Sequence, residues 1–187
     1  MAFPEPVQLT ELLTPMIKEH GFDLEDVKTA KAGKKSQVVV RVDGNQRPSS
    51  DDLESLSREI GDFFDGAEQR GELNFGAGYT LEVSTPGVDL PLTAPRHWRR
   101  NRGRVAKIET TEVPGKHELW RIGALDGNDE DSTAVVLVRT ERKEIVAEIQ
   151  RLEKIASAVV EIEFSQASAA ELEVAHEDFD VIAGRID

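Results

Sequence analysis

The chain of 187 residues contains no cysteine. This absence excludes disulfide bonds, thiolate metal sites and a cysteine nucleophile, and it is compatible with a reducing compartment. No run of apolar residues approaches the roughly 18 that a membrane span needs. The N-terminal stretch "MAFPEPVQLTELL" also lacks the basic start and the apolar core of a signal peptide. We therefore expect a cytoplasmic protein that makes no membrane contact.

Basic residues are in the minority, 23 against 36 acidic ones, and a net charge of −13 at first argues against a nucleic-acid partner. The acidic excess lies in residues 1–92 and 166–187, whereas residues 93–165 carry 13 residues of each sign. Two windows, 27–42 and 90–108, contain no acidic residue at all. We predict that their basic side chains contact RNA phosphates, and the alternative is that they form solvated faces. The predicted contacts are Lys31, Lys34, Lys35, Arg96, Arg99, Arg100, Arg102 and Arg104.

Apolar residues in the first half of the chain alternate between helical and strand periods. The spacing predicts a helix over residues 7–21, in which Pro15 either kinks the helix or leaves Thr14 to cap a new one. Capping serines and early aspartates mark the start of a second helix. The order helix, strand, strand, helix, strand predicts an α+β domain of two layers. Its remaining elements are strands over 22–30 and 37–43 joined by a hairpin, a helix over 49–64, and a strand over 79–84.

After Pro95 the helical pattern gives way to five short strands with turn-like connections. This spacing indicates a small closed or half-open barrel, because closure removes exposed strand edges. The last residues are acidic and weakly patterned, so we expect a mobile tail with a helical stretch over residues 169–175. The predicted domains are 1–92, 93–165 and 166–187. The predicted strands are 104–109, 118–125, 133–138, 144–149 and 157–164, with one helical turn over 150–156.

The stretch "EVSTPGVDLPL" stops the last strand of the first half. Ser84, Asp89 and His97 could form a nucleophile, an acid and a base, but residues so close in sequence rarely converge as a triad, and the G-x-S-x-G elbow is absent. We interpret the stretch as a rigid interdomain joint in which residues 89–92 anchor the turn against the first domain. We expect Pro91 and Pro95 to hold the following segment extended. Trp98 either packs between the domains, which we favour, or stacks on a base. The predicted joint residues are Ser84, Pro86, Gly87, Asp89, Pro91, Leu92 and Trp98.

Metal and nucleotide motifs are incomplete. The acidic stretch over residues 126–132 lacks the glycine and the downstream glutamate of a calcium loop. The four histidines are scattered, and "GKKS" at residues 33–36 lacks the first glycine of a P-loop. We predict no metal site, no cofactor and no catalytic residue.

One longer motif is specific enough to indicate a protein family. "YTLEVSTPGVDLPLTAPRHWRRNRGRVAKIE", residues 79–109, resembles the signature of the ribosome maturation factor RimP family: a strand, a Ser-Pro-Gly turn, an Asp-x-Pro-Leu segment and a basic stretch. "LLTPMIKEHGFDLEDVK" is similar to the opening helix, proline and strand of that family. The resemblance covers residues 8–164. The chain departs from the motif mildly at Thr85 and Val88, and at Leu90, where the family commonly has arginine, so one positive charge is missing from the joint.

The resemblance implies a non-enzymatic assembly factor that binds the immature small ribosomal subunit and promotes its maturation. It also implies an α/β N-terminal domain followed by an SH3-like C-terminal barrel. Family members are associated with ribosomal RNA folding near the central pseudoknot and with incorporation of the ribosomal protein at the decoding centre. We therefore expect ribosomal RNA and that basic ribosomal protein as partners of a monomer. The alternative is a general RNA-binding or RNA-chaperone module without ribosomal specificity.

Overall fold

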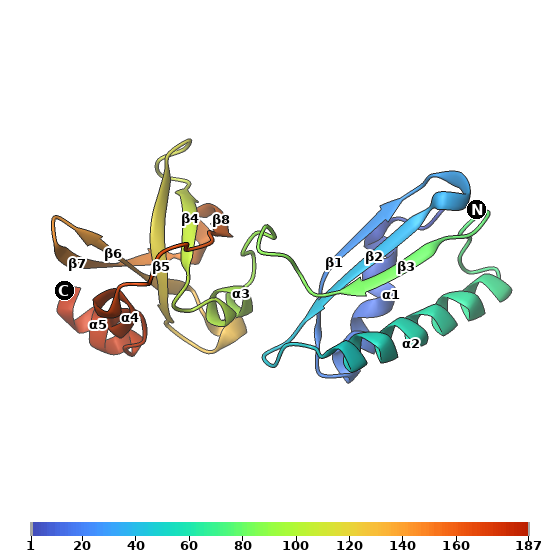
Figure 1. Ribbon diagram of the computed structural model, residues 1–187, viewed down its shortest axis with the longest axis horizontal. Coiled ribbons are helices and arrows are strands. Elements are labelled where there is room, and N and C mark those ends of the chain that lie inside the picture. The colour runs from blue at the N-terminus through green and yellow to red at the C-terminus, as the bar shows by residue number, and fades with distance from the viewer. Residues whose placement is uncertain (1, 187) are drawn as a thin grey trace. The chain divides into compact units, whose positions relative to one another are not determined.

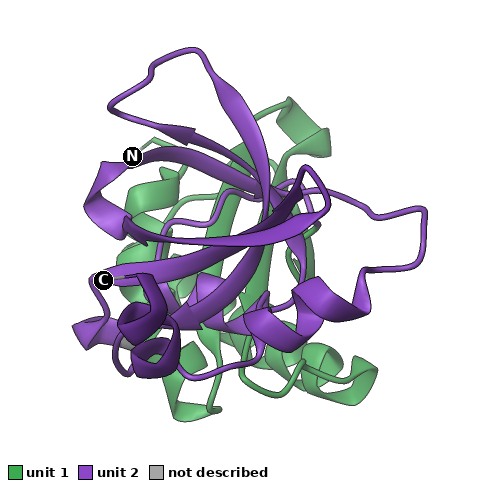
Figure 2. Ribbon diagram, turned by 90° about the vertical axis from the view of Figure 1, so that its left-hand side faces the viewer, with its two compact units in different colours: residues 1–87 green, residues 88–187 purple. Residues whose placement is uncertain are grey.

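The computed structural model describes residues 2–186 and divides into two units, residues 1–87 and 88–187 (Figure 2). We expected the first domain to extend through residue 92. Leu92 belongs instead to the second unit, because its side chain lies in the core of that unit and its backbone amide donates to the Ala158 carbonyl at 2.8 Å. Within residues 2–186, no helix combines the length and the apolarity that a membrane crossing requires.

The first unit has the predicted order of elements. Its sheet has the order β1-β2-β3, in which β1 and β2 are antiparallel and β2 and β3 are parallel. Helix α2 connects the two parallel strands, as a parallel pair requires. The elements are α1 (Pro6–Glu19), β1 (Asp23–Ala30), the short helix η1 (Gly33–Lys35), β2 (Gln37–Asp43), α2 (Ser50–Gln69) and β3 (Thr80–Ser84) (Figure 1).

The ends of α1 and α2 follow local chemistry. Helix α1 continues through Pro15, so Thr14 does not start a new helix, and it ends before Gly21, whose φ of 81° is the left-handed conformation that glycine allows. Helix α2 begins with a capping box: the Asp52 amide donates to Ser49 Oγ at 3.1 Å, and the Ser49 amide donates to Asp52 Oδ2 at 2.8 Å. It ends at Gln69 rather than at the predicted residue 64, because further residues pack into the core.

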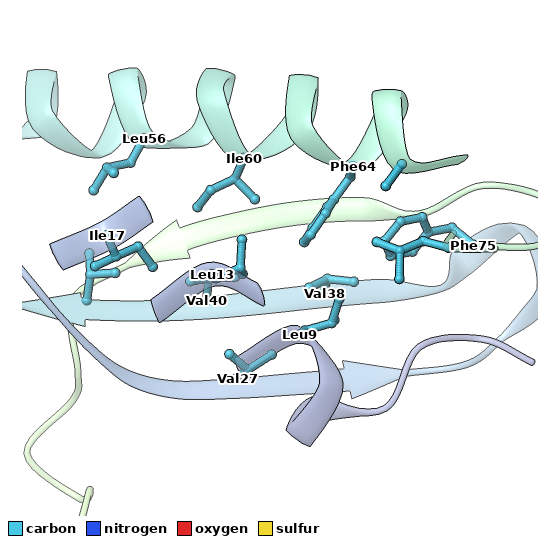
Figure 3. Packing of buried hydrophobic residues seen from close by; sticks show 13 residues of the cluster. Leu9, Leu13, Ile17, Val27, Val38, Val40, Leu56, Ile60, Phe64 and Phe75 are labelled. Carbon is cyan, nitrogen blue, oxygen red and sulfur yellow. The ribbon is translucent and has the colours of Figure 1, made fainter. Parts of the chain in front are cut away.

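The core of the first unit lies between the sheet and the two helices (Figure 3). Three alternate residues of β2 point toward the helices, and each is fully buried: Val38, Val40 and Val42. The ring of Phe75, from the connection between α2 and β3, stacks on Tyr79 with 4.3 Å between ring centroids. Burying each such large side chain contributes roughly 1.5–3 kcal/mol relative to exposure. The helix residues that complete this core are Leu9, Leu13, Ile17, Leu56, Ile60, Phe64 and Ala67.

The second unit contains the five predicted strands in one antiparallel sheet, of order β7-β6-β5-β4-β8. No ladder among the described residues joins the outer strands β7 and β8, so the closure of a barrel is not observed. The elements are α3 (Pro95–Arg100), β4 (Val105–Thr110), β5 (His117–Leu125), η2 (Asp129–Asp131), β6 (Ala134–Glu141), β7 (Glu144–Arg151), η3 (Leu152–Lys154), β8 (Ile155–Val160), α4 (Ala169–Ala175) and α5 (Phe179–Ile186).

The expectation of a mobile C-terminal tail is wrong. Helix α4 has the predicted bounds, and a second helix, α5, follows it. Helix α4 packs against β5 and β6, and α5 packs against β7 (Figure 1). Ala175 and Ile182 are buried with Val136 and Val138 of β6 in a separate apolar cluster. The weak sequence pattern hid this packing because only two apolar side chains of the two short helices are fully enclosed.

Candidate functional site

The predicted lysines of the first unit lie on the hairpin between β1 and β2. Lys31, Lys34 and Lys35 are exposed. Ser36 is only 2% exposed, and its hydroxyl donates to the Gly33 carbonyl at 2.8 Å and accepts from the Ala32 amide at 3.1 Å. The hairpin therefore carries three lysine side chains at one end of the sheet, on a turn that its own hydrogen bonds stabilise.

The predicted arginines of the second unit lie on a helix and the turn after it. We expected Pro91 and Pro95 to keep this segment extended. Helix α3 begins at Pro95 instead, because proline suits the first turn of a helix and His97 Nδ1 accepts from the backbone amides of Thr93 and Ala94, both at 3.0 Å. The half-buried side chains Arg96, Arg99 and Arg100 belong to this helix.

Arg102 and Arg104 differ in their surroundings. Arg102 donates from Nε to the Ala175 carbonyl at 2.7 Å and from Nη2 to the Glu177 carbonyl at 2.8 Å. Arg104 is exposed, and it approaches Asn101 Oδ1 at 3.4 Å. Two arginines that look equivalent in sequence thus have different roles: Arg102 holds the end of α4, and Arg104 faces solvent.

Trp98 is 3% exposed and packs in the core of the second unit with Leu92 and Trp120. These partners all belong to the second unit. The buried ring presents no face on which a base could stack, so that alternative is wrong for this structure. Trp98 anchors α3 to its own sheet.

The other joint residues divide between the units. Ser84 ends β3, and its hydroxyl donates to Glu82 Oε1 at 3.3 Å. Pro86 is half-buried, whereas Gly87, Asp89 and Pro91 are exposed. The predicted anchoring of residues 89–92 against the first domain is wrong, because Leu92 inserts into the second core.

The acidic loop that resembles part of a calcium site is organised by Asp126. Its carboxylate accepts from the Thr133 hydroxyl at 2.7 Å and from the Thr133 and Ala134 amides at 2.8 and 3.1 Å. Burial alone would raise the pKa of Asp126, but these hydrogen bonds outweigh it and lower the pKa. Among the residues that the structure describes, no group of three histidine, aspartate or glutamate side chains could hold a metal ion.

Comparison with known proteins places these observations in a family. A family model described as the RimP N-terminal domain matches residues 12–89. A protein named Ribosome maturation factor RimP from Corynebacterium aurimucosum is 58% identical to this chain, over 96% of the chain and 94% of the relative. A protein of the same name from Corynebacterium diphtheriae is 48% identical over 96% and 95%. The chain belongs to the RimP family. The predicted resemblance to this family is confirmed.

The predictions from the sequence did not include Arg121, a residue with a central position in this RimP family member. Arg121 of β5 lies among apolar strand neighbours, and its side chain is only 2% exposed. It donates from Nη1 to Glu163 Oε2 at 2.9 Å and to the Gly103 carbonyl at 2.8 Å, and from Nη2 to Glu163 Oε1 at 2.7 Å. The Arg121 guanidinium lowers the pKa of Glu163. The only sequence signal was a single charged residue within the apolar strand "LWRIGAL".

Proposed function

We propose that this RimP family member is a ribosome maturation factor that binds the immature small ribosomal subunit and promotes its maturation without catalysing a reaction. The observation that carries the proposal is the 58% identity to a protein named Ribosome maturation factor RimP over nearly the full length of both chains. We further propose that the protein acts in the cytoplasm as a monomer and needs no cofactor.

The proposed RNA contacts are the exposed lysines of the η1 hairpin and the arginines of α3 and the turn after it. Lysine and arginine neutralise phosphates and release counterions, which makes binding salt-dependent. The net charge of −13 does not oppose this role at short range, because charges beyond about one Debye length, ~8 Å at physiological salt, are screened. Arg104 is the arginine whose exposed position most favours a phosphate contact. Arg102 supports the same turn by binding the backbone at the end of α4.

The proposed protein partner is the basic ribosomal protein of the decoding centre. Acidic side chains on α2 suit a basic surface, and the outer strands β7 and β8 could each accept an added strand. We further propose that the five-stranded sheet is a half-open barrel of the SH3-like type. Its strand order supports this proposal, since the last strand, β8, lies beside the first, β4.

Sedimentation of cell extracts tests the proposed function. The protein should co-migrate with small subunits that carry precursor RNA, and deletion of its gene should cause that precursor to accumulate. Binding to free RNA with neither co-migration nor precursor accumulation would favour the general RNA-binding module and refute ribosome maturation.

A further inference from the structure

Two segments that are distant in sequence, the turn before β4 and the C-terminal segment after β8, meet at Arg121. One guanidinium binds the Gly103 carbonyl in the turn before β4, the carboxylate of Glu163 after β8, and Glu171 Oε2 of α4, the last at 3.5 Å. Glu163 accepts in the bidentate geometry that gives arginine–carboxylate pairs their directional strength. A buried cation with these partners cannot move without leaving charge unpaired in the interior, which is costly.

The turn over residues 101–104, which we call the arginine turn, is held from several sides. The Gly103 amide donates to the Ile122 carbonyl at 2.8 Å, and the Ile122 amide donates to the Arg104 carbonyl at 2.8 Å. A methyl group at Gly103 would come within 3.1 Å of the His176 ring, at the end of α4. The arginine turn therefore rests on the C-terminal segment as well as on β5.

We propose that Arg121 is a positioning residue that couples the C-terminal segment 163–186 to the arginine turn and so holds Arg104 in place for RNA. The inference rests on the proposed RNA contact of Arg104. It assigns the acidic segment a supporting role in RNA binding: its carboxylates fix Arg121, and its backbone carbonyls fix Arg102.

Simple electrostatics predicts the opposite effect of this segment on RNA affinity. Acidic residues repel phosphates, so neutralising any two of them should leave RNA affinity unchanged or raise it. If Glu163 and Glu171 position the arginine turn through Arg121, neutralising these two should lower the affinity. The sign of the change therefore separates the two explanations.

The experiment uses the full chain and a fluorescein-labelled poly(U) RNA oligomer, with affinity measured by anisotropy at several salt concentrations. The test variant is Glu163→Gln with Glu171→Gln. The matched control is Glu173→Gln with Asp180→Asn, which removes the same charge from exposed positions of the same segment. Thermal unfolding followed by tryptophan fluorescence identifies the temperature at which both variants are folded.

We expect the test variant to lose one phosphate contact, which on single-stranded RNA lowers the slope of log affinity against log salt by roughly 0.7. Over the tenfold change from 1 M to 0.1 M salt, a slope lower by this amount makes the affinity at 0.1 M about fivefold lower than that of the original chain, if both start from the same affinity at 1 M. In an Arg104→Gln background, the same pair of substitutions should produce no further change in slope. A merely structural role would not depend on Arg104 in this way.

Two outcomes overturn the inference. One is a test variant that behaves like the control pair, and the other is an equal loss of slope with and without Arg104. If the test variant is unfolded at every usable temperature, Arg121→Lys replaces it: this variant keeps the charge but loses the bidentate geometry, and an unchanged slope would likewise overturn the inference. Failure of the proposed RNA contact is recognised separately, because Arg104→Gln alone would then leave the affinity unchanged.

Discussion

Replacing Ile182 by alanine should destabilise the second unit. Ile182 is 1% exposed and packs with Val136 and Val138 on the outer side of the sheet. Isoleucine-to-alanine changes at fully buried positions cost about 2–5 kcal/mol, which includes the cavity that remains. Ile182 is the one residue of α5 that is buried among those described, so the helix can unfold locally and the loss cannot exceed the free energy with which it docks. We therefore expect a value of about 2–3 kcal/mol, near the lower end of that range.

Tryptophan fluorescence measures this loss in the second unit alone. The chain has two tryptophans, and both Trp98 and Trp120 are buried in the core of that unit. In guanidinium titrations the unfolding midpoint should fall without a change of slope. In thermal unfolding the midpoint should fall by roughly 10–20 °C, since 1 kcal/mol shifts a domain of up to about 100 residues by 4–8 °C.

The neighbouring residue Val181 supplies the control. Its side chain is 47% exposed on the same helix, so Val181→Ala should change the free energy of unfolding by less than about 0.5 kcal/mol. Equal and small effects of Val181→Ala and Ile182→Ala would refute the packing of α5 and restore the prediction of a mobile tail.

Three further predictions rest on single features. Burial, aided by nearby acidic groups, raises the pKa of Tyr79 to about 12. An ultraviolet titration should therefore place phenol ionisation near 12 in the folded protein, and a folded-state midpoint near 10 would contradict burial. The stability that the raised pKa contributes should be complete below about pH 10 and lost as pH rises toward 12. Arg142 and Lys143 have positive φ angles of 49° and 70°, so replacing them by Asn and Gly should raise unfolding stability by about 1 kcal/mol, and an unchanged denaturation midpoint would argue against a strained turn. Arg104→Gln should lower the salt slope of binding to single-stranded RNA by roughly 0.7 with little change in thermal midpoint, whereas Arg102→Gln should lower the midpoint because it releases α4; the reverse pattern would exchange their roles.

Much of the first unit could be predicted from sequence because its elements are long and strongly periodic. Alternate valines fixed the buried face of β2, and the Ser49 cap fixed the start of α2. The end of α2 could not be predicted, since Gly66 resembles a break, yet the helix continues past it to Gln69 with Ala67 buried in the core. Likewise, Phe75 lies in a stretch without any period, and its burial depends on its ring contacts with Phe64 and Tyr79.

The basic residues of the candidate site could be predicted from the sequence, but their positions and contacts in the fold could not. Charge counting identified both basic windows, yet it could not separate Arg102 from Arg104, because their difference depends on a helix more than 70 residues later in the chain. Trp98 was ambiguous for the same reason: a tryptophan among arginines suits packing or a base until its neighbours are known, although packing was favoured.

By itself, the sequence determined the family, the two-part organisation and the types of most elements, since these depend on motifs and on periods within one segment. Only the tertiary structure decided where the joint ends, how the C-terminal segment packs and which arginines face solvent. Each of those depends on contacts between segments distant along the chain, and Arg121 is the clearest case. In sequence it is a single charge in an apolar strand, and in the fold it joins the arginine turn to α4.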